Sequence, residues 1–380
     1  MKFGVLNELE QRKPWDDNQE FRTFWNAIDQ VKQAEAAGFD YAWTVEHHFL
    51  SEYSHSSAPE VFLAAAAQHT STIRLGHGVL LTAPGFNHTF RTAERLATLD
   101  IACKGRLEFG AGRSVTTQEL HGFGIATEDS RPSMLEGLRE IPRMWTNEVY
   151  PGTEGRTKYI DLPAREVLPK PLQQPHPRIY MACTNPESFA LAGKLGVGIL
   201  CFVVGHPDRL KPLIDIYREA ITEAEPIGAF KNEHVAAFTI GHCADSRQDA
   251  EKFAAPEVTW YVERLAGLFT QVAGKPGYEA YEQILGDMMG EYQALAEKYH
   301  NDVRALTELG VVCIGDPRTC SEVTSGYQAQ GIDQFITLQQ FGRLPHGRVM
   351  RSLQLMGEQV IPKFRDMAPI TPATRVPVTG

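Results

Sequence analysis

A glutamate and two histidines follow one another as Glu46, His47 and His48, directly after an apolar and aromatic run from Tyr41 to Val45. An imidazole titrates near neutral pH and can both take up and return a proton. Two imidazoles beside a carboxylate can also bind a metal ion. The apolar run suits a buried strand that releases these residues at its exit. They are therefore candidates for proton transfer, for metal binding or for a hydrogen-bonded loop.

The alternation of side chains along a strand separates the two histidines. It places His47 on the side of Trp43 and Val45, and Glu46 with His48 on the other side. We therefore expect one histidine to face the site and choose His47 for proton transfer, with His48 as the alternative. Glu46 either orients its neighbour or caps a loop. A metal hydrolase is a weaker reading, and we expect no metal, because the chain has no HExxH motif and no distributed carboxylate set.

Two further places along the chain can hold an anion. Arg113 follows a glycine-rich strand end, although arginines after barrel strands also make ordinary ion pairs. Arginine is permanently charged and binds oxyanions through two N–H groups. Thr184, Asn185 and Ser188 stand at the start of another predicted helix, where they either cap it or donate to a phosphate. From these residues alone, capping is the default.

Eight apolar segments alternate with helical patterns, which predicts a single (β/α)8 TIM barrel over residues 1–365. Ligands of such barrels bind at the C-terminal ends of the strands, where Glu46, His47, His48 and Arg113 lie. The predicted strands are residues 2–7, a strand from residue 41, and residues 73–81, 106–110, 178–182, 197–203, 235–243 and 332–338. The main predicted helices cover residues 23–38, 58–70, 90–102, 207–224 and 348–364, and others begin near residues 131, 184, 246 and 315.

Three segments fall outside this alternation. Residues 146–177 are rich in Pro, Gly and charge and are expected to leave the barrel, with a possible short hairpin near Tyr159. Residues 256–301 are longer than a barrel connection requires and are a candidate mobile-loop insertion. Residues 366–380 carry several prolines and are expected to form a flexible tail.

Composition limits the function classes. The 380 residues are 43% hydrophobic and 22% charged, with no apolar run long enough for a membrane span, and the N-terminus lacks the pattern of a signal peptide. We therefore expect a cytoplasmic protein. The net charge of −10 argues against nucleic acid and anionic membranes as partners. The six cysteines form no CxxC pair, so neither a zinc ribbon nor a redox pair is predicted.

Small residues mark two places of close approach. Gly76 and Gly78 weaken the strand over residues 73–81, either because a flat ligand or another backbone comes close or because a bulge curves the barrel. The run Ala64 to Ala67 lets another helix approach, either in tight packing on the barrel or in a subunit contact.

In two blocks the chain resembles the bacterial luciferase-like flavin monooxygenases. Residues 38–49, with Gly-Phe-Asp, Trp43 and Glu-His-His-Phe, are similar to the GFD…W…EHHF segment of that family. Residues 93–110 are similar to its AE…LD…GR…FG block. The resemblance implies a barrel that binds reduced FMN, forms a flavin peroxide with O2 and oxygenates a small organic substrate. A separate flavin reductase would supply the FMNH2, and we expect a homodimer.

The resemblance also implies roles for individual residues. His47 matches the catalytic acid/base, Arg113 and Arg131 match phosphate-binding arginines, and residues 184–188 match a phosphate turn, which favours cofactor binding there over simple capping. Gly78 and Val79 lie where the family strand runs against the flavin ring, sometimes through a non-proline cis peptide. Residues 256–301 match the mobile loop. The expected cofactor-binding residues are Gly78, Val79, Arg113, Arg131, Thr184, Asn185 and Ser188, and the expected substrate pocket consists of Glu46, His48, Thr82 and His121.

Two departures limit the resemblance. Gly112 stands where luciferase has a cysteine near the reactive flavin carbon, and the region from His77 to Asn87 is longer than its counterpart. We therefore do not expect light emission or specificity for long-chain aldehydes. The alternatives that stay open are a deazaflavin-dependent oxidoreductase that transfers hydride and a flavin-binding protein without turnover.

Overall fold

The computed structural model describes residues 1–114, 116–201, 205–270, 290, 294–295, 297–298 and 302–365. Eight parallel strands form a closed barrel, because the last of them, β10, pairs with both β1 and β8. This confirms the predicted (β/α)8 fold. The barrel strands are β1 (Lys2–Asn7), β2 (Tyr41–Thr44), β3 (Arg74–His77), β5 (Leu107–Gly112), β6 (Arg178–Cys183), β7 (Gly198–Cys201), β8 (Val235–Cys243) and β10 (Gln334–Leu338).

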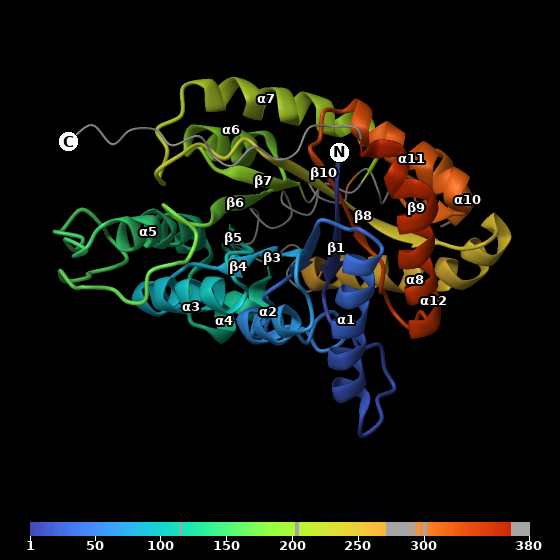
Figure 1. Cartoon of the computed structure of the whole chain (residues 1–380), viewed down its shortest axis with the longest axis horizontal. Coiled ribbons are helices and arrows are strands. Elements are labelled where there is room, and N and C mark those ends of the chain that lie inside the picture. The colour runs from blue at the N-terminus through green and yellow to red at the C-terminus, as the bar shows by residue number, and fades with distance from the viewer. Residues whose placement is uncertain are drawn as a thin grey trace.

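Helices surround the strands, with α6 and α7 on one side of the barrel and α2 and α3 on the opposite side (Figure 1). In the described part of the chain, no helix combines the length and the apolarity that a membrane span requires. The α-helices are α1 (Gln19–Ala36), α2 (Pro59–Gln68), α3 (Thr89–Ala102), α4 (Thr117–Gly122), α5 (Thr127–Thr146), α6 (Pro186–Lys194), α7 (Leu210–Thr222), α8 (Arg247–Thr270), α10 (Val303–Glu308), α11 (Pro317–Ala329) and α12 (His346–Leu355).

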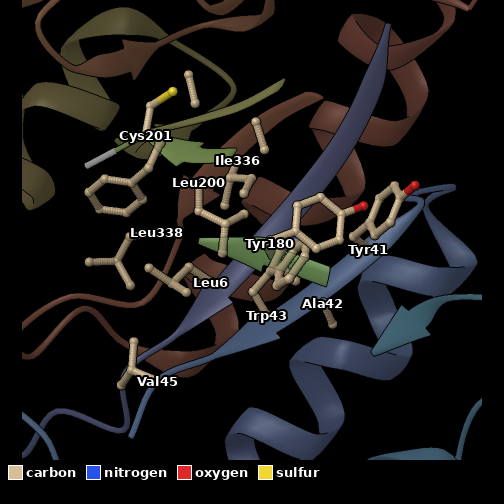
Figure 2. Packing of buried hydrophobic residues seen from close by; sticks show 14 of the residues in the cluster. Leu6, Tyr41, Ala42, Trp43, Val45, Tyr180, Leu200, Cys201, Ile336 and Leu338 are labelled. Atoms are coloured by element: carbon tan, nitrogen blue, oxygen red, sulfur yellow. The ribbon is translucent and has the colours of Figure 1, made fainter. Parts of the chain in front are cut away.

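The inside of the barrel is filled by large side chains from facing strands, gathered around Trp43 in Figure 2. The Trp43 ring meets the edge of Tyr180 at a centroid distance of 5.3 Å. Gly76 pairs with Trp43 in the neighbouring strand, and a Cβ atom at Gly76 would lie 2.3 Å from the indole. Gly76 therefore makes room for the side chain of Trp43. The expectations for this position were a flat ligand, another backbone or a bulge, and not a neighbouring side chain.

Several predicted boundaries need correction. The predicted strand 73–81 is interrupted at the cis peptide Gly78–Val79, and its second part, β4 (Leu80–Leu81), pairs with β5. Arg131 does not open a helix but lies in the second turn of α5. A short strand, β9 (Cys313–Gly315), extends the pairing at the end of β8 and was not predicted.

The predicted insertion also begins too early. Helix α8 continues through Pro256 as far as Thr270, so residues 256–270 are helical, and most of residues 271–301 lie outside the described residues. The tail over residues 366–380 lies outside them as well. Within residues 146–177, an isolated antiparallel bridge joins Tyr150 to Arg165 and encloses the region where a hairpin was expected.

Candidate active site

A cavity lies at the C-terminal ends of the strands. Its wall includes Val45 after β2, Gly78 and Val79 after β3, Arg113 after β5 and Thr184 after β6. Parallel strands of a barrel deliver the residues at their C-terminal ends to one face, which brings together groups that are far apart in the sequence. The predicted site therefore coincides with a real cavity of the barrel.

His47 lines this cavity and is held by a buried carboxylate. The ring atom Nδ1 lies 2.9 Å from Oε1 of Glu119 in α4, and the side chain of Glu119 is fully buried. Three other groups donate to the same carboxylate: Ser114 Oγ at 2.7 Å, Thr116 Oγ1 at 2.6 Å and the backbone N–H of His48 at 3.0 Å. Because Nδ1 is engaged by Glu119, Nε2 is the ring nitrogen left for chemistry in the cavity.

The electrostatics of this pair favour a charged imidazole. Burial acts to lower the pKa of His47, but the nearby carboxylates of Glu119, Glu8 and Glu46 outweigh it, so the pKa lies above the usual value. Burial likewise opposes ionisation of Glu119, but the charge and hydrogen bond of His47 hold the Glu119 pKa below its usual value. His47 is therefore set up to donate a proton from Nε2 while Glu119 stays ionised.

The cavity wall also carries donors for an anion. These are Arg113, Arg131, Thr184 and Ser188. The guanidinium of Arg131 forms a 2.7 Å ion pair with Glu187, whose side chain is 75% exposed at the start of α6. An exposed carboxylate is a weak competitor, so a phosphate with higher charge can take its place beside Arg131.

Asn185 has a different role from the one predicted. Its side chain accepts a hydrogen bond from the backbone N–H of Ser188 at 3.0 Å, while Ser188 Oγ accepts from the N–H groups of Thr184 and Asn185. This is a capping box at the N-terminus of α6. Asn185 is not among the residues on the cavity wall, so it orients the turn, whereas Thr184 and Ser188 reach the cavity.

Much of the remaining wall is apolar, with Val79, Leu81, Met134, Met181 and Leu191. At Gly112 an added Cβ would lie 2.2 Å from Cγ2 of Val79, so a glycine is needed for the end of β5 to come this close. A cavity with apolar walls, two arginines and two hydroxyls fits a flat ring that carries a phosphate tail. FMN and deazaflavins both have this form.

Of the four residues expected in the substrate pocket, Glu46 is the one on the cavity wall. Glu46 lines the cavity, but its carboxylate accepts hydrogen bonds from Leu81 N at 2.6 Å, Asn87 Nδ2 at 2.9 Å and His48 Nε2 at 3.1 Å, so it joins the ends of β2 and β4. His48 is not on the wall; its ring packs against Phe123 at 4.8 Å. His48 therefore pairs with Glu46, whereas His47 pairs with Glu119.

Thr82 and His121 lie away from the cavity wall. Thr82 is buried, and its hydroxyl donates to the backbone oxygen of Met134. His121 is exposed on α4, because it lies two residues from the buried Glu119 and therefore on nearly the opposite face of that helix. Neither residue is among those on the wall of the cavity.

Sequence reasoning missed several residues of the site. Glu119 was overlooked, although the pattern Thr116-x-x-Glu119 is a capping-box signature, and Thr116 does accept from the N–H of Glu119. Glu8 and Tyr53 also line the cavity, and Leu265 of α8 contributes from a segment expected to be a loop. No signal in the sequence marked Tyr53 or Leu265.

Comparison with known proteins places these features in a family. Residues 1–334 match the family model described as luciferase-like monooxygenase. The chain is 23% identical over 370 residues to the oxygenase component of the flavin-dependent trigonelline monooxygenase of Acinetobacter baylyi, covering 96% of each protein.

Two solved structures share the fold. The oxygenating constituent of 3,6-diketocamphane monooxygenase from Pseudomonas putida, in complex with FMN, aligns with a TM-score of 0.77 and 22% identity over 96% of this chain and 98% of that one. The coenzyme F420-dependent tetrahydromethanopterin reductase of Methanopyrus kandleri aligns with a TM-score of 0.67 and 21% identity over 96% and 99%. At these identities the likeness extends to the fold alone.

Proposed function

The chain belongs to the luciferase-like monooxygenases, and we propose that it is the oxygenase component of a two-component enzyme that uses reduced FMN. A separate reductase supplies FMNH2, as the name of the trigonelline relative, an oxygenase component, suggests. The substrate is a small organic molecule and O2 is the oxidant. The coarser assignment, a flavin-dependent monooxygenase, rests on the family and on its named members.

The observation that carries the proposal is the arrangement of one cavity. Its wall carries an imidazole held by a buried carboxylate together with two arginines and two hydroxyls. Arg113 and Arg131 would neutralise the phosphate of FMN, and Thr184 and Ser188 would donate to it. Val79, Met134 and Met181 would enclose the ring and exclude water.

The remaining chemistry falls to His47. Reduced FMN supplies the electrons that activate O2 when it is bound. Nε2 of His47 donates a proton to the oxygen that develops negative charge and afterwards recovers a proton, while Glu119 stabilises the imidazolium and fixes the ring. An apolar wall favours a neutral substrate with little hydrogen-bonding capacity.

We further propose a homodimer in the cytoplasm. Three large apolar side chains are exposed on neighbouring helices: Phe21 at 65% and Trp25 at 43% on α1, and Val61 at 60% on α2. An exposed cluster of this kind on a soluble protein usually marks an interface. All six cysteines are free and buried, which suits a reducing compartment.

Two variants and one control test the function with photoreduced FMN and a panel of aldehydes, terpenoid ketones and aromatic compounds. His47→Ala should bind FMN nearly as the wild type does but form product at least about 100-fold more slowly. Arg113→Ala should weaken FMN binding about 10- to 100-fold, because a charge-assisted contact to phosphate is lost. Arg139→Ala, an exposed arginine on the same helix as Arg131, should change neither.

Oxygen uptake, peroxide yield and product formation are measured together. Unchanged turnover in His47→Ala would remove the assignment of this residue as the acid/base. If reduced FMN gives no oxygen uptake with any substrate while reduced F420 supports hydride transfer, the deazaflavin-dependent alternative replaces the present proposal. Binding of FMN without any turnover would instead identify a flavin-binding protein.

A further inference from the structure

Two acidic side chains, Glu8 and Glu10, lie at the exit of β1 and point into the protein. Their exposed fractions are 3% and 5%. Glu8 lies on the wall of the active-site cavity, and both residues line a second, more polar cavity that is bordered by α1 and residues 340–344. The pair therefore stands between the active site and a separate polar space.

The backbone between the two glutamates is held in an unusual conformation. Leu9 has a φ angle of 55°, in the left-handed region that a leucine rarely adopts. A single residue in this region costs free energy and persists only where the surrounding structure enforces it. This turn brings the two neighbouring acidic side chains to the same interior region, and such outliers cluster at functional sites.

Hydrogen bonding leaves one oxygen of each carboxyl group without an ordinary donor. Glu8 Oε1 accepts from the hydroxyls of Tyr53 at 3.1 Å and Tyr261 at 3.3 Å, and Glu10 Oε2 accepts from the N–H of Gly342. Glu8 Oε2 and Glu10 Oε1 are buried without a donor among the described groups, and both side chains line the same polar cavity. A proton between them would satisfy both atoms.

We propose that Glu8 and Glu10 share one proton at neutral pH and that Glu8 delivers it into the active-site cavity, as a second proton donor beside His47. Ionising both of two neighbouring buried carboxyl groups costs free energy, so the resting pair retains one proton. The shared proton follows from the pair itself, whereas its delivery to a bound molecule rests on the proposed function.

The surrounding charges fit a shared proton. Burial raises the pKa of Glu8, partly offset by the facing charge of His47 and by the hydroxyls of Tyr53 and Tyr261. Burial also raises the pKa of Glu10 well above its usual value, and Glu8 and Glu257 raise it further. Glu257 forms a 2.8 Å ion pair with Arg12, so that arginine is already engaged.

Proton delivery requires two balanced steps. The O–H bond of Glu8 breaks and an O–H bond forms on an acceptor oxygen of the molecule in the cavity, which leaves both carboxyl groups ionised. Glu10 then takes up a proton from bulk solvent by way of the second cavity and shares it with Glu8, which restores the starting state. No electron is transferred in either step, and the second cavity provides the route to solvent.

The first test uses flavin-free protein and infrared spectroscopy of the C=O stretch of protonated carboxyl groups at neutral pH. The double variant Glu8→Gln/Glu10→Gln should lose one such group relative to the wild type. Glu140→Gln is the matched control, because Glu140 is also buried and accepts from a tyrosine, Tyr150, at 2.7 Å, but belongs to α5 away from the cavity wall. Wild-type intensity in the double variant would overturn the shared proton.

The second test adds photoreduced FMN and a substrate accepted by the wild type. Glu8→Gln should slow product formation by about 10-fold or more, since a carboxamide cannot donate a proton in this way, whereas Glu140→Gln should match the wild type. Normal turnover in Glu8→Gln would overturn proton delivery. A wild type without oxygen uptake would contradict the proposed function, while the infrared result would still decide the shared proton.

Discussion

At the scale of single residues, the site depends on how a histidine is held. His47 was identified from its position at a strand exit, but its partner Glu119 lies 72 residues away in the chain. Alternation along a strand predicts which way a side chain points and says nothing about the group that it meets. The carboxylate beside it was the only partner that the local sequence suggested, and Glu46 instead holds Leu81, Asn87 and His48.

The pH dependence of activity follows from this partner. In Glu119→Gln the negative charge next to Nδ1 is lost, so the pKa of His47 should fall from its raised value. Because His47 acts as a proton donor, the fall in kcat/KM on the alkaline side should move to lower pH. Glu140→Gln should leave the profile unchanged, and an unmoved alkaline limb in Glu119→Gln would contradict the role of Glu119.

At the scale of elements, the strands of the barrel were predictable because each is a short apolar run bounded by turn residues. Helix α4 could not be predicted in this way, because its six residues are too few to show a helical period. Pro256 suggested the end of a helix, yet α8 continues through it. The buried residues Ala250, Ala254, Val258 and Leu265 pack this helix against the barrel, and that packing outweighs the hydrogen bond that a proline removes.

The contact between β2 and β3 gives a prediction about stability. Gly76→Ala would place a methyl group into the indole of Trp43, which is buried and has no room to move. We expect a loss of about 1–3 kcal/mol in the free energy of unfolding, measured with urea. Gly326→Ala in α11 is the control, because its Cβ would meet nothing within 4 Å, and it should raise stability by up to about 1 kcal/mol. Equal stability of the two variants would show that the barrel interior adapts to the added methyl group.

At the scale of the whole molecule, the surface divides into charged and apolar regions. The chain carries a net charge of −10, so copies of it repel one another unless a specific surface brings them together. The rings on α1 and α2 form a connected surface: Phe21 and Trp25 lie 6.4 Å apart, and Trp25 approaches His69 at the end of α2 at 6.1 Å. The run Ala64 to Ala67 was expected either to pack on the barrel or to form a subunit contact. Ala66 and Ala67 pack inward, whereas Ala64 and Ala65 are partly exposed.

This surface is where we expect the dimer to form. In a symmetric dimer each substitution occurs twice across the interface, so Val61→Glu should place two new charges in an apolar contact and yield a monomer by light scattering. Leu172→Glu is the control, because Leu172 is 55% exposed but lies in the segment between α5 and β6. It should leave the molar mass unchanged. A Val61→Glu protein that stays dimeric would move the interface elsewhere, and a monomeric wild type would exclude the dimer without affecting the active site, because the cavity described above is formed within one chain.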